Sequence, residues 1–597
     1  MMKLFRKYVL SYVGDAKQVR GFAAEQVRSI PGDRITLLIS VMVLIMGAVV
    51  YRLFSLQIVD YAFYEALASD QHDIQKILQA DRGEILMRDF SQGDKEYPVA
   101  TNKEFFQIYA VPKQIKDPKA VVEALSPLVN VNKEDLLAKL SQSEDPYEPV
   151  ERKVSPERYD YIKSLKLEGI YAVPETYRFY IDDNVGSQVI GFVGVKDDKP
   201  HGFYGIEGYF NEVLSGKPGY FKTERDVAGR WIALSDKTVV EAQDGDDVVL
   251  TIDRTVQFMT CKALDEAVTK YGAKGGAIVI MDPYSGRIMA MCSNPDFNPN
   301  YYSKVDDASA YNNESIFTAY EPGSIFKPII MSSAIDLDRV TPDSTFEDTG
   351  SVKIDEFTIK NANDKIYGVE TMTGVLENSI NTGMIHVARL MGREAFADYV
   401  KRFGFGEKTG IELDKEVAGN ISSVDKKGEI FMATASFGQG ITVTPLQMAV
   451  AYSAIANGGN LLKPYVVDEI RHADGRVEKR APTTIRRVIS SRASVLLTGM
   501  LTSVVTRGHS IKAQIPGYYV AGKTGTAQVA NPKGGGYLEN VQNHSFVGYA
   551  PADEPKYVMV IKLDQPTAAI FADATTTPVF RELSMFILNY YAVPPDF

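Results

Sequence analysis

The chain has few of the residues from which metal and redox sites are built. Among 597 residues there are only two cysteines and six histidines, and neither C-x-x-C nor H-E-x-x-H occurs. These absences argue against a metal centre or a redox-active dithiol, and we expect neither a metal nor a cofactor. Cys261 and Cys292 can form a disulfide only if folding brings them together, and we expect two buried thiols instead.

The chain also lacks a basic excess, internal repeats and low-complexity tracts. Its formal net charge is −11, whereas nucleic-acid-binding proteins usually present a basic face, so we expect no nucleic-acid partner. A hydrophobic content of 45% with 24% charged residues is typical of a globular protein. A length of 597 residues is too great for one compact core, so we expect at least two domains.

Long apolar runs are absent except for one near the N-terminus. Residues 35–51 read ITLLISVMVLIMGAVVY without a charge, and apolar residues continue briefly past Arg52. At 1.5 Å per residue, this run is at the short end of what spans a bilayer core. The alternatives are a buried soluble helix or a cleaved signal peptide. The preceding tail is long for a signal peptide, and no small-x-small cleavage site follows directly. We therefore expect an uncleaved transmembrane helix at 35–55.

Lysine and arginine counts predict the orientation of this helix. Residues 1–34 contain seven of these residues, whereas four acidic residues precede Lys76, the first basic residue after Arg52. Basic flanks tend to stay on the cytoplasmic side of a membrane. We therefore expect residues 1–34 to be a cytoplasmic tail of a single-pass membrane protein, with everything after residue 55 outside the cytoplasm.

The residue pattern changes near Asp244-Gly245. Residues 56–245 are rich in turns and short apolar runs, which is typical of an irregular α+β region; its expected helices are 121–128 and 134–140, the second with an N-cap in VNVNK. Residues 246–597 place strands at both ends and helices between them, which favours a mainly antiparallel sheet flanked by helices, and so an α+β fold overall. The helices expected there are 255–271, 324–336, 374–391, 445–456 and 577–591, and the strands are 246–253, 276–281, 287–292, 519–529, 545–549 and 556–563.

The first of three short motifs is Ser324-Ile325-Phe326-Lys327. Ser324 begins an expected helix, whose N-terminal dipole favours a developing alkoxide or oxyanion. Lys327 lies three residues on, so it projects from the same face. It can take the serine proton only if its pKa is lowered by burial or by a nearby cation, for which Lys523 is the candidate. Taken singly, Ser324 would be a helix N-cap and Lys327 a solvated charge.

The other two motifs are Ser379-Ile380-Asn381 and Lys523-Thr524-Gly525-Thr526. The first offers a hydroxyl that can relay a proton and a carboxamide that can hold a substrate amide, although alone it would be a polar helix cap. The second lies in an expected strand, where its lysine and hydroxyls can bind a carboxylate and Gly525 lets a bound peptide approach the backbone. An N–H of this strand and that of Ser324 could form an oxyanion hole. The whole set suits attack on a peptide bond next to a carboxylate.

The third motif has a competing interpretation. Residues 517–524 also fit the phosphate-loop pattern G-x-x-x-x-G-K-[ST], and residues 277–282 resemble a metal-binding strand that ends in Asp282. A phosphate loop must open a helix, so that its N–H groups converge on the anion. Tyr518-Tyr519-Val520-Ala521 favours extended structure instead, and no convincing helix follows Gly525. We therefore prefer a strand to a nucleotide site.

Together these features resemble one family. The chain is similar along nearly its whole length to the class B penicillin-binding proteins, the monofunctional peptidoglycan D,D-transpeptidases. Glu321-Pro322-Gly323-Ser324 and Thr577-Pro578-Val579-Phe580 resemble the division (septal) branch more than the elongation branch. Besides the anchor and the three motifs, the resemblance rests on Tyr204-Gly205-Ile206-Glu207-Gly208, Leu214-Ser215-Gly216-Lys217-Pro218-Gly219, Leu250-Thr251-Ile252-Asp253, Asp282-Pro283 with Ser285-Gly286, Gly438-Gln439-Gly440, Thr444-Pro445-Leu446-Gln447 and Ala550-Pro551.

The resemblance implies an architecture and a reaction. Residues 56–245 would be the pedestal, often called the dimerisation domain, and residues 246–597 the penicillin-binding transpeptidase domain. Ser324 would be acylated by the penultimate D-Ala of a stem peptide, with Lys327 as the base, Ser379 as the proton relay and release of the terminal D-Ala. An amine of a neighbouring stem peptide would then take the acyl group, and a carboxypeptidase side activity would be hydrolysis of the same intermediate. A β-lactam would acylate the same serine.

The remaining roles and the partners also follow from the resemblance. Asn381 would orient the substrate, Lys523 and Thr524 would bind its terminal carboxylate, and Thr526 would provide the second oxyanion N–H. No glycosyltransferase domain precedes the pedestal, so a membrane-embedded SEDS-type glycosyltransferase and other divisome proteins would be partners. The location would be the cytoplasmic (inner) membrane of a bacterium, with the catalytic domain outside the cytoplasm.

The chain departs from the family in the pedestal, and two other functions compete with catalysis. Where the family pattern R-G-x-I-x-D-R-x-G has an aspartate and a final glycine, this chain has Met87 and Phe90. Where the family has R-x-Y-P, this chain has Arg178-Phe179-Tyr180-Ile181. A β-lactam sensor would use the acyl-serine as a signal, but no cytoplasmic effector is present. A non-catalytic divisome scaffold would not need the complete motif set. We therefore expect an enzyme.

Overall fold

The computed structural model describes residues 73–142, 144–224, 238–531 and 533–597, together with 42, 44–47, 49–51 and 53–54. The chain divides into two compact units. One comprises Met1–Leu78 with Gly219–Glu241, and the other comprises Gln79–Pro218 with Ala242–Phe597. In the first unit an antiparallel sheet has the order β1-β8-β9, formed by β1 (Asp73–Leu78), β8 (Gly219–Glu224) and β9 (Thr238–Val240).

The expected cytoplasmic tail and most of the expected transmembrane segment lie outside the described residues. None of residues 1–34 is described, and ten of residues 35–55 are, all of them helical. Within the described part of the chain, no helix has both the length and the apolar character needed to cross a membrane.

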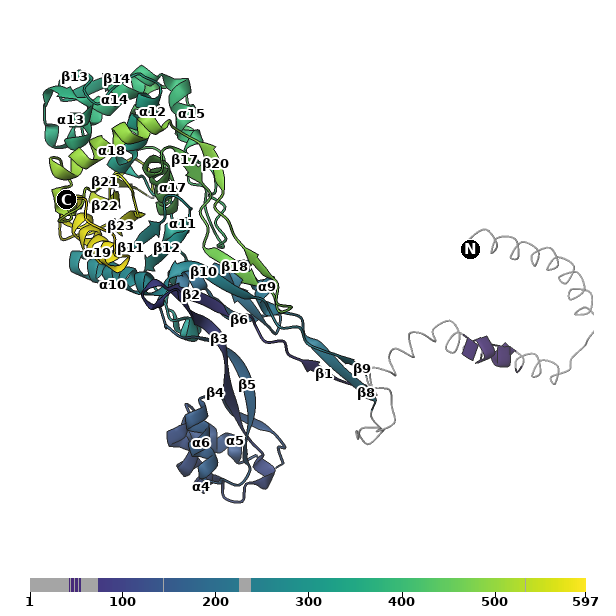
Figure 1. Ribbon diagram of the computed structural model, residues 1–597. Helices are drawn as coiled ribbons and strands as arrows, with labels where there is room; N and C mark the ends of the chain where they lie inside the picture. The colour runs from purple at the N-terminus through teal and green to yellow at the C-terminus, as the bar shows by residue number, and fades with distance from the viewer. Residues whose placement is uncertain are drawn as a thin grey trace, which may run out of the picture. The chain divides into compact units, whose positions relative to one another are not determined.

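A five-stranded antiparallel sheet forms the centre of the second unit (Figure 1). Its first two strands, β12 (Ile288–Asn294) and β11 (Gly275–Met281), form a hairpin: Asp282 accepts hydrogen bonds from Tyr284 N and Ser285 Oγ, and Gly286 turns the chain at a φ of 87°. The antiparallel sheet predicted for this part of the chain is thus confirmed. Its strands, in spatial order, are β12, β11, β23 (Tyr557–Asp564), β22 (Tyr537–Ala550) and β21 (Ala521–Ala530).

Helices cover both faces of this sheet. On one face α10 (Arg254–Tyr271) and α19 (Thr576–Tyr590) enclose an apolar core, and the two helices lie together in Figure 1. On the other face the core includes α12 (Lys327–Asp336), α17 (Pro445–Ala456) and α18 (Ser491–Thr506). Almost every residue of α17 is buried, as expected for a helix that is apolar all round. A capping box between Thr444 and Gln447 fixes where α17 begins.

A second sheet joins the two halves of the chain. Strand β10 (Asp247–Asp253) pairs in parallel with β2 (Ile85–Asp89) and antiparallel with β18 (Val467–Arg471). Ion pairs reinforce this connection, because Arg471 binds Glu96 through two nitrogens at 2.6 and 2.7 Å. The full order is β19 (Val477–Lys479), β18, β10, β2, β3 (Lys95–Ala110) and β4 (Glu148–Val154), with β5 (Ile170–Tyr180) also paired to β3.

Three short helices gather around the ends of β4 and β5 (Figure 1): α4 (Pro118–Leu125), α5 (Lys133–Leu140) and α6 (Pro156–Ser164). Each begins at a residue whose side chain accepts backbone N–H bonds, namely Asp117, Asn132 and Ser155. The helices expected at 121–128 and 134–140 are confirmed, and Asn132 is the N-cap expected within VNVNK.

A buried carboxylate binds the C-terminal end of β5 to the segment before β2. Glu207 is fully buried and binds Arg82 and Arg178, each at 2.6 Å. Burial alone would raise the pKa of Glu207, but the two guanidinium groups keep it below its usual value. Met87, which stands where the family has an aspartate, lies in the core, and Phe90 packs against Tyr591 with ring centroids 4.9 Å apart.

The remaining elements are short and mostly connect these layers. The other helices are α7 (Ser187–Ile190), α8 (Gly205–Tyr209), α9 (Asn211–Ser215), α11 (Glu314–Phe317), α13 (Met372–Glu377), α14 (Asn381–Met391), α15 (Arg393–Arg402) and α16 (Glu429–Ala435). Two-stranded sheets pair β6 (Phe192–Lys196) with β7 (Lys199–Phe203), β13 (Thr345–Asp348) with β16 (Gly368–Thr371), β14 (Ser351–Ile354) with β15 (Phe357–Lys360), and β17 (Asn460–Leu462) with β20 (Thr484–Arg487).

Two expectations need correction. The helix expected at 374–391 is broken at residues 378–380, between α13 and α14. The two cysteines are not free thiols: Cys261 on α10 and Cys292 on β12 form a disulfide, because α10 packs directly against β12 and brings the two Cα atoms to 5.3 Å. A sequence separation of 31 gave no indication of this contact.

The disulfide should stabilise the folded chain measurably. It closes a loop between residues 31 apart, for which chain entropy suggests about 3–4 kcal/mol. We therefore expect dithiothreitol to lower the melting temperature of the wild type in a thermal scan. The Cys261→Ala/Cys292→Ala double variant should melt at the same temperature with and without reductant. Alkylation of unreduced native protein by a maleimide would contradict the disulfide.

Candidate active site

Ser324 lies in a 3₁₀ turn, η8 (Gly323–Phe326), that continues directly into α12. The expected helix is therefore present, but its first turn is tighter than an α-helix. The turn rests on the loop of residues 438–440, since Gly323 N donates to the Gly438 carbonyl at 3.0 Å. A Cβ on Gly438 would come within 2.2 Å of Gly323, so only glycine permits this contact.

Lys327, one turn beyond the serine, is fully buried. Its Nζ lies 2.6 Å from the Ser379 carbonyl oxygen, 3.2 Å from Ser379 Oγ and 2.8 Å from Asn381 Oδ1. A lysine amine forms three hydrogen bonds at most when protonated, so these contacts use its full capacity and fix its position.

Ser379 connects the lysine to Ser324. Its Oγ lies 3.0 Å from Ser324 Oγ, and the same oxygen contacts Lys327 Nζ. Ser379 follows the end of α13 with a φ of 54°, a left-handed conformation that helices often use to terminate but rarely with serine. This conformation directs both the carbonyl and the hydroxyl of Ser379 at the lysine. A continuous hydrogen-bonded path therefore runs from Ser324 through Ser379 to Lys327.

The third motif lies on β21, the strand at one end of the five-stranded sheet. The strand packs against η8: a Cβ on Gly525 would lie 3.0 Å from both Ile325 Cγ2 and the Pro322 carbonyl oxygen. The Ser324 turn and Ser545 fill the space that a side chain on Gly525 would occupy, while the expectation that a bound peptide approaches this backbone stays a prediction. The absence of a side chain thus lets β21 and the serine turn meet.

Lys523 is fully buried on β21, and its Nζ donates to the Thr524 carbonyl at 3.2 Å. Thr524 is almost buried, and Thr526 Oγ1 accepts a hydrogen bond from Ala572 N at 3.2 Å. Because residues 521–530 form a strand and no helix begins at Lys523, the phosphate-loop interpretation is wrong. Asp282, its suggested metal ligand, lies in the hairpin turn. Over the residues described, no group of three or more His, Cys, Asp or Glu side chains could hold a metal ion.

Burial controls the charges of the two lysines. Desolvation, together with the positive charge of Lys523, lowers the pKa of Lys327 well below that of a free lysine. Burial also lowers the pKa of Lys523 to about 7. The first amine thus loses its proton at a lower pH than a free lysine and can then accept one, while the second retains part of its positive charge near pH 7.

Two residues that no motif indicated hold the start of α14. Asn361 Oδ1 accepts from Asn381 N at 3.0 Å and from Thr382 N at 3.2 Å, and its Nδ2 donates to Asp348 Oδ2 at 2.9 Å. Asp348 Oδ1 accepts from Thr382 Oγ1 at 2.6 Å, and all of these side chains are buried. Ile380, the N-cap residue of α14, makes no side-chain cap bond, so Asn361 supplies the cap from a distant segment.

The same segment orients the Asn381 side chain. Asn381 Nδ2 donates to the Lys360 carbonyl at 3.1 Å, which leaves Oδ1 directed at Lys327. At the other side of the site, Glu321 accepts from Gly440 N at 3.0 Å and from the Tyr537 hydroxyl at 2.9 Å. These contacts join residues far apart in the chain, so no local sequence pattern could have revealed them.

Comparisons with known proteins agree with this geometry. The sequence profile of the family described as "Penicillin binding protein transpeptidase domain" matches residues 276–585, and that of "Penicillin-binding Protein dimerisation domain" matches residues 77–250. The chain is 34% identical over 564 residues to stage V sporulation protein D of Bacillus subtilis, covering 93% of this chain and 86% of that protein. It is 30% identical over 506 residues to the peptidoglycan D,D-transpeptidase FtsI of Escherichia coli K12, covering 84% and 83%.

A solved structure gives the same result. Penicillin-binding protein 3 of Mycobacterium tuberculosis, complexed with aztreonam, superposes with a TM-score of 0.67 at 26% identity, covering 87% of this chain and 98% of that one. Profile, sequence and structure agree, and the motifs that converge at Ser324 lie within the first matched domain. The chain belongs to the penicillin-binding protein transpeptidase family.

Proposed function

We propose that this protein is a peptidoglycan D,D-transpeptidase that cross-links stem peptides through an acyl-enzyme on Ser324. The observation that carries the proposal is the hydrogen-bonded path from Ser324 Oγ through Ser379 Oγ to the buried Lys327 amine. A serine hydroxyl becomes a useful nucleophile only when a base removes its proton. The lowered pKa of Lys327 leaves more of this amine neutral than in a free lysine, so that it can act as the base.

In the acylation step, the proton of Ser324 passes to Ser379 while the proton of Ser379 passes to Lys327. Ser324 Oγ forms a bond to the carbonyl carbon of the penultimate D-Ala, and the bond to the terminal D-Ala breaks. The leaving amine takes the proton back along the same path, and the D-Ala departs. An amine of a second stem peptide then attacks the ester and loses its proton to Lys327; the new peptide bond forms as the ester bond breaks, and Ser324 takes the proton back from Lys327 through Ser379. Water in place of that amine would give carboxypeptidase activity.

The other residues of the site bind and stabilise. By the family resemblance, Lys523 and Thr524 of β21 would bind the terminal carboxylate through a charged amine and a hydroxyl. The N–H groups of Ser324 and Thr526 would stabilise the oxyanion. Asn381 would bind both the substrate amide and the amine of Lys327. A β-lactam presents a carboxylate next to a strained amide, and so would acylate Ser324 as an inhibitor.

The cellular setting follows from the same family. We assign residues 56–245 to the pedestal and 246–597 to the transpeptidase domain, a division near which the two family profiles meet. Residues 35–55 would anchor the chain in the cytoplasmic membrane, with residues 1–34 inside and both domains outside. The Cys261–Cys292 disulfide supports an oxidising location outside the cytoplasm. A septal role with a SEDS-type glycosyltransferase and other divisome partners rests on the family resemblance.

Ser324→Ala should abolish covalent labelling by fluorescent penicillin, because among the residues that the structure describes no other hydroxyl is connected to Lys327 through Ser379. Ser332→Ala is the matched control: this serine lies on α12, is fully buried and hydrogen-bonds only the Ile329 carbonyl, so labelling should persist. Mass spectrometry of the peptic fragments should locate the adduct on Ser324 in the wild type. An adduct on another residue would contradict the assignment of the nucleophile.

Asn361→Ala should slow acylation without removing any group of the three motifs. Losing the cap of α14 costs about 1–2 kcal/mol, which corresponds to a rate lower by roughly 5- to 30-fold if the whole loss is felt at Asn381 and Lys327. The measurement is the second-order rate constant for acylation by a penicillin. Thr358→Ala, an exposed substitution on neighbouring β15, should leave that constant unchanged. Equal rates for the two variants would show that Asn361 does not position the site.

A further inference from the structure

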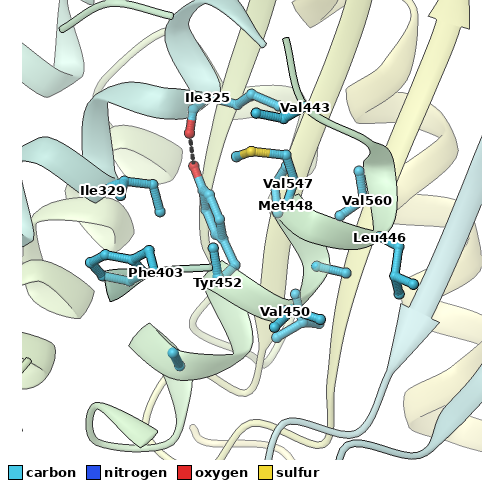
Figure 2. Close-up of a cluster of buried hydrophobic side chains, with 14 of the residues drawn as sticks. Ile325, Ile329, Phe403, Val443, Leu446, Met448, Val450, Tyr452, Val547 and Val560 are labelled. Carbon is cyan, nitrogen blue, oxygen red and sulfur yellow. Dashed lines mark hydrogen bonds between the residues drawn. The ribbon is translucent and has the colours of Figure 1, made fainter. Parts of the chain in front are cut away.

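One buried tyrosine contacts the serine turn from the core. Tyr452 lies on α17, is fully buried, and its hydroxyl donates to the Ile325 carbonyl at 2.7 Å. Figure 2 shows its hydroxyl directed at that carbonyl, while apolar side chains surround the ring. The labelled neighbours are Ile329, Phe403, Val443, Leu446, Met448, Val450, Val547 and Val560.

The Ile325 carbonyl needs a donor that its own helix does not supply. The 3₁₀ turn ends at Phe326 and α12 begins at Lys327, with Phe326 as its N-cap. The first carbonyl that α12 satisfies is therefore that of Phe326, one residue beyond Ile325. The N–H that would continue the 3₁₀ pattern belongs to residue 328, which is proline and has none. The Tyr452 hydroxyl takes the place of this missing N–H.

The surroundings make this hydrogen bond persistent. Burial raises the pKa of Tyr452 well above its usual value, so the hydroxyl stays protonated and can always donate. The site is an apolar core, where an unpaired carbonyl is costly because water cannot replace the donor. Helix α17 is itself fixed by its capping box and by contacts with β11, β22 and β23. The turn is thereby attached to the sheet that carries Lys523.

Resting on the function proposed above, we infer that Tyr452 is a positioning residue for acylation. Ile325 lies between Ser324 and Lys327 in the chain, so the hydrogen bond from Tyr452 to its carbonyl restrains the backbone that carries both side chains. With this backbone fixed, the 3.0 Å contact between Ser324 Oγ and Ser379 Oγ is preorganised. No residue of the three motifs makes this connection, and Tyr452 lies 127 positions from Ile325 in the sequence.

The test compares two tyrosine-to-phenylalanine substitutions in the full-length protein. Tyr549 is also fully buried, and its hydroxyl bonds Thr498 Oγ1 at 2.8 Å, away from the serine turn. Both Tyr452→Phe and Tyr549→Phe remove one buried hydroxyl and should lower the melting temperature. The second-order rate constant for acylation by a penicillin should fall roughly 10- to 100-fold in Tyr452→Phe only. Equal rate constants in the two variants would overturn the inference.

A donor at the same position should restore the rate. 4-Aminophenylalanine at position 452 retains an N–H donor where the hydroxyl was, whereas 4-methylphenylalanine fills the space without one. Recovery of acylation with the amino but not the methyl residue supports a positioning hydrogen bond, and also decides the question if the phenylalanine variant fails to fold. Equal rates for these two residues would contradict it.

The experiment separates this inference from the proposed function. Failure of the wild type to form a covalent adduct at Ser324 would refute the function itself. A wild type that acylates normally, beside a Tyr452→Phe variant that acylates equally fast, would refute only the role of Tyr452.

Discussion

The structure of the site depends on a lysine amine buried without a carboxylate partner. Burying a charged ammonium group is costly, and the cost falls when the group gives up its proton. The chain buries Lys327 completely, gives it only uncharged oxygens from Ser379 and Asn381, and places a second lysine nearby. Burial and the nearby Lys523 favour the neutral amine, which the proposed reaction needs, and the surrounding oxygens hold that amine in position. The left-handed Ser379, the break between α13 and α14, and the cap from Asn361 all serve to present oxygens to this amine.

The rest of the fold acts as a frame for that arrangement. The serine turn is held by β21 at Gly525, by the 438–440 loop at Gly323 and by Tyr452 at Ile325. Each contact comes from a different element, so the turn is fixed from several directions, and the contacts of Gly438 and Tyr452 come from outside the catalytic motifs. The sheet through β10 and β2 continues this rigidity into the pedestal half of the chain. Preorganisation of this kind lowers the cost of reaching the transition state.

Local patterns were sufficient for the elements and the motifs. Alternating and continuous apolar runs located β11, β12, β21 and β23, and the Thr444–Gln447 capping pattern agrees with the start of α17. Two failures have one cause, which is contact between distant segments. The Cys261–Cys292 disulfide depends on how α10 packs, and the break at Ser379 depends on the lysine that Ser379 contacts. Asn361 and Tyr452 were not identified for the same reason. Their side chains bind backbone N–H or carbonyl groups of segments that are distant in the sequence, so no short stretch of sequence contains both partners.

The most direct test of this account is the pH dependence of the second-order rate constant for acylation by a penicillin. The constant should be small in acid, rise as Lys327 loses its proton at a pH well below that at which a free lysine does, and fall above about pH 7, where Lys523 loses the charge that attracts the carboxylate. In Lys523→Arg the guanidinium keeps its charge, so the fall at high pH should disappear while the rise remains. A rate constant that climbs steadily to pH 10 in the wild type, as an ordinary lysine would dictate, would contradict the neutral-amine mechanism.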